Sequence, residues 1–183
     1  MRTHLASLLI LSLAAGCGAA PPKENTIFEA FKRELPAMDA LATQAQAALS
    51  NAESIELVFL VPDENFSAPQ KDPGKEYFNW WEVTGKTVLS DTDRQTVAQR
   101  LSSDIETNHR KPYADCFEPR HALRTRAKDG GQLDIVLCFR CTQLWCFDQH
   151  GNRIESQTGI SKELQPLLDS FRPNAGVAKP QTY

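Results

Sequence analysis

A β-hairpin signal in the second half of the chain constrains the fold more than any other feature. Two short runs with strand-like composition, residues 123–127 and 133–139, flank the dipeptide Asp129-Gly130. Asp-Gly between two such runs is typical of a hairpin closed by a two-residue loop. The sequence therefore predicts a pair of antiparallel strands here, and with it a sheet whose neighbouring strands are joined by tight turns.

The predicted two-residue loop also determines which residues face each other across the hairpin. The facing pairs are Lys128–Gly131, His121–Cys138 and Cys116–Gln143. In this register Cys141 is the diagonal neighbour of Cys116 on the same face, within reach if the strand bends. Pro119 cannot donate a hydrogen bond to the ladder, so we expect the pairing to be weakest near Cys116.

Five further segments show the periodicity of regular structure. In three of them apolar residues recur at steps of three and four, which predicts amphipathic helices, and two are short apolar runs that end at turn residues, which predicts strands. The helices are expected at 26–50, 91–108 and 162–171, and the strands at 54–62 and 76–83. The second hairpin strand is expected to continue through 142–147 with a bend or bulge.

This order of elements predicts an α+β fold: an antiparallel sheet of about five strands with helices packed on one face. Pro36 is expected to kink or split the first helix, and Ser161 to cap the last one. Trp80 and Trp81 are adjacent in a predicted strand and should therefore point to opposite faces. One of them then belongs to the core, and the other either packs on the sheet, which is the more common use, or is a surface aromatic that binds a sugar or a peptide.

The N-terminal sequence is typical of a secretory signal. Arg2 precedes an apolar run from Leu5 to Ala15 that is too short to stay in a bilayer as a helix. The end of this run, Leu-Ala-Ala-Gly before Cys17, resembles the lipobox of bacterial lipoproteins. The resemblance implies that residues 1–16 are a lipoprotein signal peptide and that Cys17 carries lipid as the first mature residue. It also implies a lipid-anchored protein of the cell envelope, at the outer membrane if the host is Gram-negative.

The rest of the chain divides into a tether, one domain and a tail. Residues 17–25 hold the lipidated cysteine and an extended tether, 26–172 are expected to form a single α+β domain, and 173–183 form a flexible tail. The formal net charge of −3 argues against nucleic acid, and against an anionic membrane surface as an electrostatic partner. The expected partners are the membrane, through the lipid anchor, and an envelope protein or a small ligand.

Four cysteines follow the predicted anchor, namely Cys116, Cys138, Cys141 and Cys146. An even number of cysteines in an exported chain predicts disulfide bonds, which are stable in oxidising compartments. The hairpin register favours the Cys116–Cys141 pair, with Cys146 either bonded to Cys138 or free. Such a bond typically contributes about 2–4 kcal/mol to stability. The first hypothesis for this region is therefore a structural staple.

Two other hypotheses remain open for the same region. Zinc accepts the ligand types of a C-x4-H motif followed by C-x2-C, which here means Cys116, His121, Cys138 and Cys141. A zinc knuckle needs a tight turn within C-x2-C, however, and Phe139-Arg140 lacks typical turn residues. The C-x2-C motif also suggests thiol redox chemistry, although no helix pattern follows Cys141 to lower the pKa of a thiol.

The segments CFEPRHAL and DIVLCFRC together resemble a group of small uncharacterised bacterial proteins, many of them lipoproteins. Members carry a C-F-x-P-R-H-x-[IL] segment shortly before a C-F-x-C segment, which here correspond to residues 116–123 and 138–141. Cys146 lies outside that pattern. The resemblance covers less than half of the chain and implies no activity. Three cysteines and a histidine fit a lone disulfide less well than a metal or thiol site, which keeps the zinc hypothesis open.

Four arginines form a further candidate site. If side chains alternate regularly along the strands, Arg120, Arg124 and Arg126 share one face and Arg140 lies on the partner strand. Together these arginines form either a solvated face or a patch that binds an anion. No phosphate-binding glycine loop and no hydrolase motif is present in the sequence. The function that we predict is therefore a non-catalytic envelope interaction or accessory module with no cofactor. The alternative is a zinc-binding or thiol-redox protein.

Overall fold

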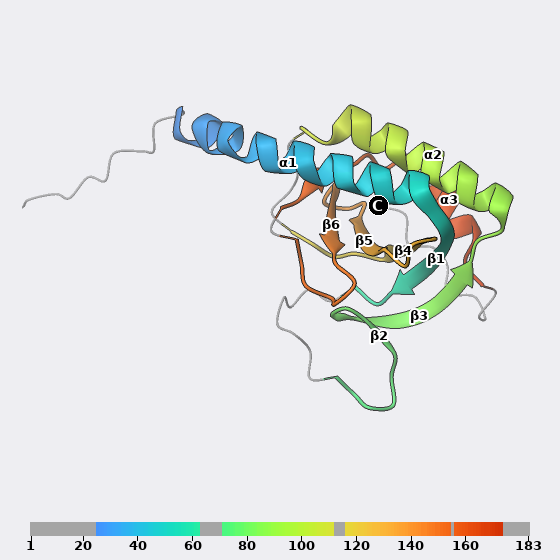
Figure 1. Cartoon of the computed structure of the whole chain (residues 1–183). Helices are drawn as coiled ribbons and strands as arrows, with labels where there is room; N and C mark the ends of the chain where they lie inside the picture. The colour runs from blue at the N-terminus through green and yellow to red at the C-terminus, as the bar shows by residue number, and fades with distance from the viewer. Residues whose placement is uncertain (1–24, 63–70, 112–115, 155, 174–183) are drawn as a thin grey trace, which may run out of the picture.

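Seven strands form one antiparallel sheet in the computed structural model, which describes residues 25–62, 71–111, 116–154 and 156–173. The order across the sheet is β2-β3-β1-β4-β5-β6-β7. The sheet curls, and helices lie together along one side of it (Figure 1). The strands are β1 Ala52–Leu60, β2 Tyr77–Phe78, β3 Trp81–Val88, β4 His121–Ala127, β5 Gln132–Cys138, β6 Gln143–Phe147 and β7 Thr158–Gly159.

The α+β class is confirmed, but the prediction of about five strands is wrong. The predicted strand at 76–83 divides into β2 and β3, which are joined by a tight turn at Asn79 and Trp80. Asn79 has a φ of 52°, a conformation that asparagine accepts more readily than most residues. The other additional strand is β7, which has two residues. A strand this short has no periodicity that a sequence pattern could reveal.

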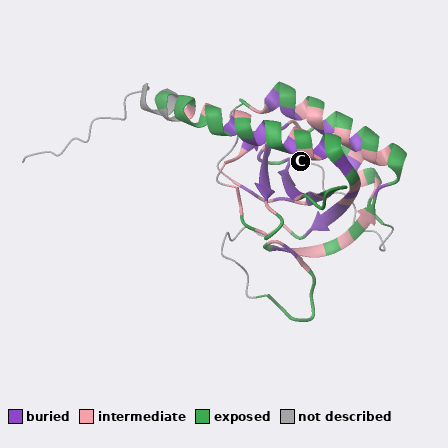
Figure 2. Ribbon diagram, in the orientation of Figure 1, coloured by how far each residue is buried: buried purple, intermediate pink, exposed green. Residues whose placement is uncertain are grey.

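Three helices cover one face of the sheet, which we call the helix face: α1 Asn25–Asn51, α2 Asp91–Asn108 and α3 Gln165–Ser170. Ser90 caps α2, because its side chain accepts a hydrogen bond from the Asp93 amide. The apolar stripe of α2, Val97, Leu101 and Ile105, is fully buried against the sheet. Figure 2 shows the same division along α1 and α2, with buried residues toward the strands and exposed ones outward.

Two helix predictions need correction. The segment around Pro36 remains one helix, so the predicted split is wrong, and the alternative that the proline kinks the helix stays a prediction. Ser161 does not form the cap of α3, which begins at Gln165 rather than at 162. Its amide instead donates a 2.8 Å hydrogen bond to Oδ2 of Asp104, and its hydroxyl is bound to the same carboxylate. Ser161 therefore links the segment before α3 to α2.

The hairpin of β4 and β5 is present, but the predicted register is wrong by one residue. The loop has three residues, because Ala127 faces Gly131 and Gly130 adopts a φ of 85°. This is the three-residue hairpin loop that ends in a left-handed residue. His121 consequently faces Leu137 rather than Cys138. A shift of one residue moves a whole strand's side chains to the other face, so the correction changes the expected surroundings of the site.

The opposite face of the sheet carries a second, smaller core that we call the aromatic face. It is built from alternate residues of the central strands and closed by Phe78 and Trp81 at the β2–β3 turn and by Phe117 in the loop before β4. Its other members are Val58, Leu60, Ala122, Val136, Cys138, Cys141, Trp145 and Phe147. The sheet is therefore buried on both sides, by helices on one and by short segments on the other.

Candidate functional site

The three cysteines of the two motifs meet at the turn between β5 and β6. The sequence predicted that the second hairpin strand continues through this region. In the structure the chain instead reverses direction at residues 139–142, and Cys138 pairs with Gln143. Thr142 has a φ of 53°, which helps to close the turn. The C-x2-C motif thus spans a tight turn, the feature that the residues Phe139-Arg140 did not reveal.

A disulfide joins Cys116 to Cys141, with a Cα–Cα distance of 5.8 Å. This is the pairing that the sequence favoured, although the register used to favour it was wrong. The bond connects the loop before β4 to the β5–β6 turn, and the Gln143 side chain donates a hydrogen bond to the carbonyl of Cys116. Cys141 is fully buried, whereas Cys116 is only partly buried at the margin of the aromatic face.

Cys138 lies beside this disulfide as a free, fully buried thiol. The backbone amide of Cys141 donates a 3.2 Å hydrogen bond to its Sγ atom. Burial raises the pKa of the Cys138 thiol, and the backbone amides of Cys141, Glu118 and Arg140 oppose this effect only in part. The thiol is therefore protonated at neutral pH, although three backbone donors surround the sulfur and would stabilise its thiolate.

Cys146 lies on the other face of the sheet. It belongs to the helix-face core, is fully buried and is not bonded to another cysteine. Burial raises the pKa of its thiol far above the ordinary value. Because Cys138 belongs to the aromatic face, the two free thiols point to opposite sides of the sheet. The possible Cys138–Cys146 bond is therefore absent from this structure.

His121 does not join the cysteines. It is 1% exposed and lies on the helix face between the rings of Phe59 and Phe139. Its Nε2 atom is 2.9 Å from Oδ1 of Asp169 in α3. Among the residues that the structure describes, no three His, Cys, Asp or Glu side chains are grouped so that they could hold a metal ion. The proposed zinc set therefore converges only in its three cysteines, and zinc binding stays a prediction.

The loop that carries Cys116 is held down by an aromatic stack. The Phe117 ring stacks on Trp145 at a centroid distance of 3.7 Å and an angle of 2°. The guanidinium carbon of Arg153 lies 3.6 Å from the centroid of the same Trp145 ring. Two groups this close to one centroid must occupy opposite sides of the ring, so Trp145 is sandwiched between them. A cation on an aromatic ring contributes about 0.5–2 kcal/mol.

Two of the four predicted patch arginines bind carboxylates of the chain itself. Arg124 makes two 2.8 Å hydrogen bonds to the Asp134 carboxylate, which is 1% exposed. Arg140 in the β5–β6 turn pairs with Glu118 at 2.5 Å. These ion pairs attach neighbouring segments to each other. Arg120 is partly buried just before β4, and Arg126 is exposed near the β4–β5 loop. Binding of an external anion by this group remains a prediction.

Trp80 and Trp81 divide between surface and core. Trp81 is 5% exposed in the aromatic face, and Trp80 is 36% exposed in the β2–β3 turn. They do not belong to one strand, so the predicted alternation is not the reason for this division. The exposed Trp80 ring packs edge-on against Trp145 and Phe147 at 6.2 and 5.3 Å between centroids. This ring is thus the outer layer of the aromatic core.

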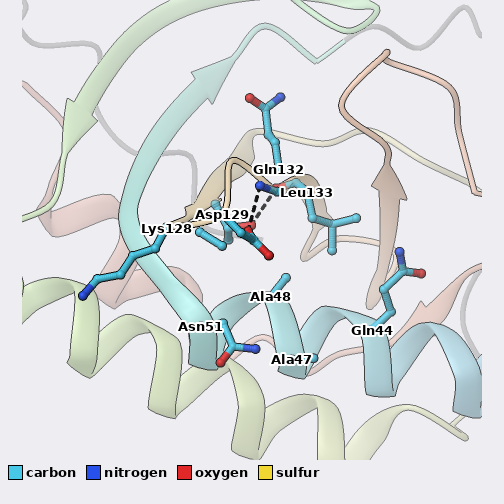
Figure 3. A pocket seen from close by; sticks show the side chains of 11 residues that line it. Gln44, Ala47, Ala48, Asn51, Lys128, Asp129, Gln132 and Leu133 are labelled. Atoms are coloured by element: carbon cyan, nitrogen blue, oxygen red, sulfur yellow. Dashed lines mark hydrogen bonds between the residues drawn. The ribbon is translucent and has the colours of Figure 1, made fainter.

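A groove of about 560 Å³ lies between the second half of α1 and the β4–β5 hairpin. Figure 3 shows Ala47 and Ala48 of α1 facing Leu133 across it, with the polar side chains of Gln44 and Gln132 at its margins. At the hairpin loop the Gly131 amide donates a 3.0 Å hydrogen bond to Oδ1 of Asp129. The groove is shallow, and its apolar floor is made of small side chains.

Sequence reasoning placed Gln143 opposite Cys116 but missed three other groups near the cysteines, namely Glu118, Trp145 and Arg153. Their positions depend on the β5–β6 turn, which the sequence did not indicate. It also missed the role of Asp134, for which a signal existed. A lone aspartate inside the apolar run of residues 133–139 must find a partner when the strand is buried on both faces. Arg124, its directly facing residue in β4, is that partner.

Several predictions concern residues for which the structure gives no description. Cys17, the signal peptide and the tether lie before residue 25, and the tail lies mostly beyond residue 173. Within the described ranges, no helix has the length and apolar character needed to cross a bilayer.

No family model, curated protein or solved structure matches the chain.

Proposed function

We propose that this protein is an exported, lipid-anchored module of the cell envelope that acts by interaction rather than by catalysis. The observation that carries the proposal is the Cys116–Cys141 disulfide between two segments of the aromatic face. Disulfides of this kind persist in oxidising compartments and are rare in the cytosol, which supports export. The lipobox-like segment that ends at Cys17 supports the anchor independently.

The position of α1 supports a short connection between membrane and body. This helix begins at Asn25, eight residues after Cys17. A fully extended chain spans about 3.3–3.6 Å per residue, so the start of α1 would lie within roughly 30 Å of the lipid. The first turns of α1 extend beyond the sheet (Figure 1) and add to the distance between lipid and body. In this arrangement the disulfide is a staple, and the body meets a partner protein or a small ligand in the envelope.

The anchor is tested by metabolic labelling with a fatty acid and by fractionation. The wild-type protein should incorporate the label and sediment with membranes. The Cys17→Ala variant should lose the label and either leave the membrane fraction or remain there as uncleaved precursor. A Cys138→Ser variant should behave as the wild type in both assays. Labelling of Cys17→Ala at the wild-type level would overturn the proposal.

A zinc-binding or thiol-redox function is the second candidate. The observation that favours it is the gathering of three cysteines at one turn, with the Cys141 amide directed at the Cys138 sulfur. Hydrogen bonds to sulfur are typical of metal-bound thiolates, whose charge they stabilise. Intact mass of the native and the denatured protein, with and without thiol alkylation, separates the two candidates. A zinc ion lost on denaturation, or cysteines that alkylate readily in the native protein, supports the second candidate. A disulfide without zinc, together with thiols that alkylate only after denaturation, supports the first.

A further inference from the structure

The cysteine cluster contains a free thiol placed against a disulfide. Cys138 and Cys141 are separated by only two residues of a tight turn, and the Cys141 amide lies 3.2 Å from the Cys138 sulfur. Cys138 and Cys141 belong to the core of the aromatic face, and Cys116 packs against the same core from the loop before β4. The Cys138 thiol thus lies beside the disulfide that joins these two chain segments.

The two ends of that disulfide differ in their surroundings. Cys141 is fully buried in the aromatic face beside Cys138, whereas Cys116 is partly buried in the loop before β4. A thiolate released at Cys116 would be solvated more readily than one released at Cys141. Because a better stabilised thiolate leaves faster, attack at the Cys141 sulfur with departure of Cys116 is the favoured direction.

We propose that the three cysteines form a thiol–disulfide exchange unit, in which Cys138 displaces Cys116 from Cys141 and so presents a reactive thiol at the surface. The Cys138 thiol gives its proton to solvent, and its thiolate attacks the Cys141 sulfur. The Cys138–Cys141 bond forms as the Cys116–Cys141 bond breaks, and the Cys116 thiolate takes up a proton. One disulfide and one thiol are present before and after, so the step needs no oxidant or reductant.

The surroundings of Cys138 keep this unit in its resting form at neutral pH. The attacking species is the thiolate, and burial raises the pKa of the Cys138 thiol so that little of it is present. The Cys141 amide, which lies 3.2 Å from the sulfur, would stabilise the thiolate once it forms. Exchange should therefore be slow and should accelerate as the pH rises. The Cys116 thiol would then form mixed disulfides with thiol- or disulfide-bearing molecules of the envelope.

The proposal is tested by alkylation of the native full-length protein with iodoacetamide, followed by mapping of the modified cysteines and the remaining disulfide by mass spectrometry. The expected product carries the label on Cys116 and a Cys138–Cys141 disulfide. Its rate of formation should rise with pH. Cys146 serves as an internal reference for global unfolding, because its full burial in the helix-face core protects its thiol from the reagent until the molecule unfolds. Labelling of Cys116 should be faster than labelling of Cys146 by about tenfold or more, since local opening costs less free energy than global unfolding.

Two matched variants make the test decisive. Cys138→Ser removes the attacking sulfur with little change in volume and should abolish labelling of Cys116, whereas Cys146→Ser should leave it unchanged. Labelling of Cys138 with the Cys116–Cys141 bond intact would overturn the proposal, as would equal labelling rates at Cys116 and Cys146. An absence of label before unfolding would do the same. None of these outcomes depends on the lipid anchor, which is tested separately by labelling of Cys17.

Discussion

The helix face of the sheet is closed by helices whose apolar stripes lie across the strands, whereas the aromatic face is closed by a two-strand hairpin and a loop. On the helix face the core is mainly aliphatic, and α1 and α2 each bury several consecutive turns. On the aromatic face the closing segments contribute only a few side chains, among them Phe78, Trp81 and Phe117. Short segments bury too little apolar area to hold themselves in place.

Because its closing segments are short, the aromatic face therefore depends strongly on a few specific bonds. They are the Cys116–Cys141 disulfide, the bidentate ion pair between Arg124 and Asp134, and the sandwich around Trp145. Each of them joins a closing segment or strand to its neighbour. The difference suggests that single substitutions on the aromatic face remove specific links, whereas those on the helix face act through packing. The predictions below test this distinction.

The largest effect is expected from Asp134→Ala. This carboxylate is 1% exposed, accepts two hydrogen bonds from Arg124 and is 3.3 Å from the Asn79 amide of the β2–β3 turn. Removing one partner of a buried ion pair leaves the other charge uncompensated and costs about 3–5 kcal/mol. Urea denaturation followed by fluorescence should show this loss, with a smaller loss for Asp134→Asn. Asp91→Ala, with a side chain 89% exposed, is the control. A cost equal to that of the control would contradict the assigned role.

A smaller and more local effect is expected when Cys116 and Cys141 are both replaced by serine. The bond closes a loop with a sequence separation of 25, for which a disulfide contributes about 3 kcal/mol. Hydrogen exchange should accelerate in β6 and in residues 116–118 more than in α2, because only the aromatic face loses a link. Reductant should lower the melting temperature of the wild type and leave that of the variant unchanged. Uniform acceleration over both faces would show that the two faces are not separable.

Gly159→Ala tests close packing at the edge of the helix face. A Cβ atom at this position in β7 would lie 2.3 Å from the carbonyl oxygen of Asn108, at the end of α2. A backbone atom cannot move aside as the end of a flexible side chain can. We therefore expect the free energy of unfolding to fall by about 1–3 kcal/mol, as measured by thermal unfolding. Gly74→Ala is the matched control, since its nearest contact would be an ordinary 3.4 Å to the Asp72 side chain. If the two variants are equally stable, β7 does not constrain α2.

The elements of the helix face were the most predictable from sequence. The apolar stripe of α2 and its cap at Ser90 follow from helical periodicity and from the capping chemistry of serine, and both are present. Such signals are local, because they depend on residues a few positions apart in one helix. The register of β4 and β5 is different. Asp129-Gly130 suits a two-residue loop and also a three-residue loop in which Gly130 is left-handed. The choice between the two loops decides to which face of the sheet the side chains of a strand point.

The aromatic face and its cysteines were predicted only in part. The Cys116–Cys141 pair was favoured by a hairpin register that proved wrong by one residue, and the turn at 139–142 could not be predicted. Phe139-Arg140 carries no turn signal, and the left-handed residue there is Thr142 rather than a glycine. The contacts of Cys138 and the separation of His121 onto the helix face follow from that turn and from the true register. Tertiary packing, rather than local propensity, determines this part of the fold.

The smallest effect is expected from Asp169→Asn, which tests the link between α3 and the helix face by its pH dependence. Burial raises the pKa of the Asp169 carboxyl, but the hydrogen bond from His121 and the nearby charges of His121 and Arg172 outweigh it, so the pKa lies below its ordinary value. A carboxyl with a lowered native pKa stabilises the fold above its unfolded pKa of about 4, and this contribution is lost as the pH falls through the native pKa. The wild type should therefore be more stable than the variant at neutral pH, and the difference should narrow in acid. Urea titrations at a series of pH values measure it, and Arg172→Gln, which removes one nearby charge, should show the same trend with smaller amplitude. A difference that stays constant with pH would show that the charge of the Asp169 carboxylate does not help to hold α3 on the sheet.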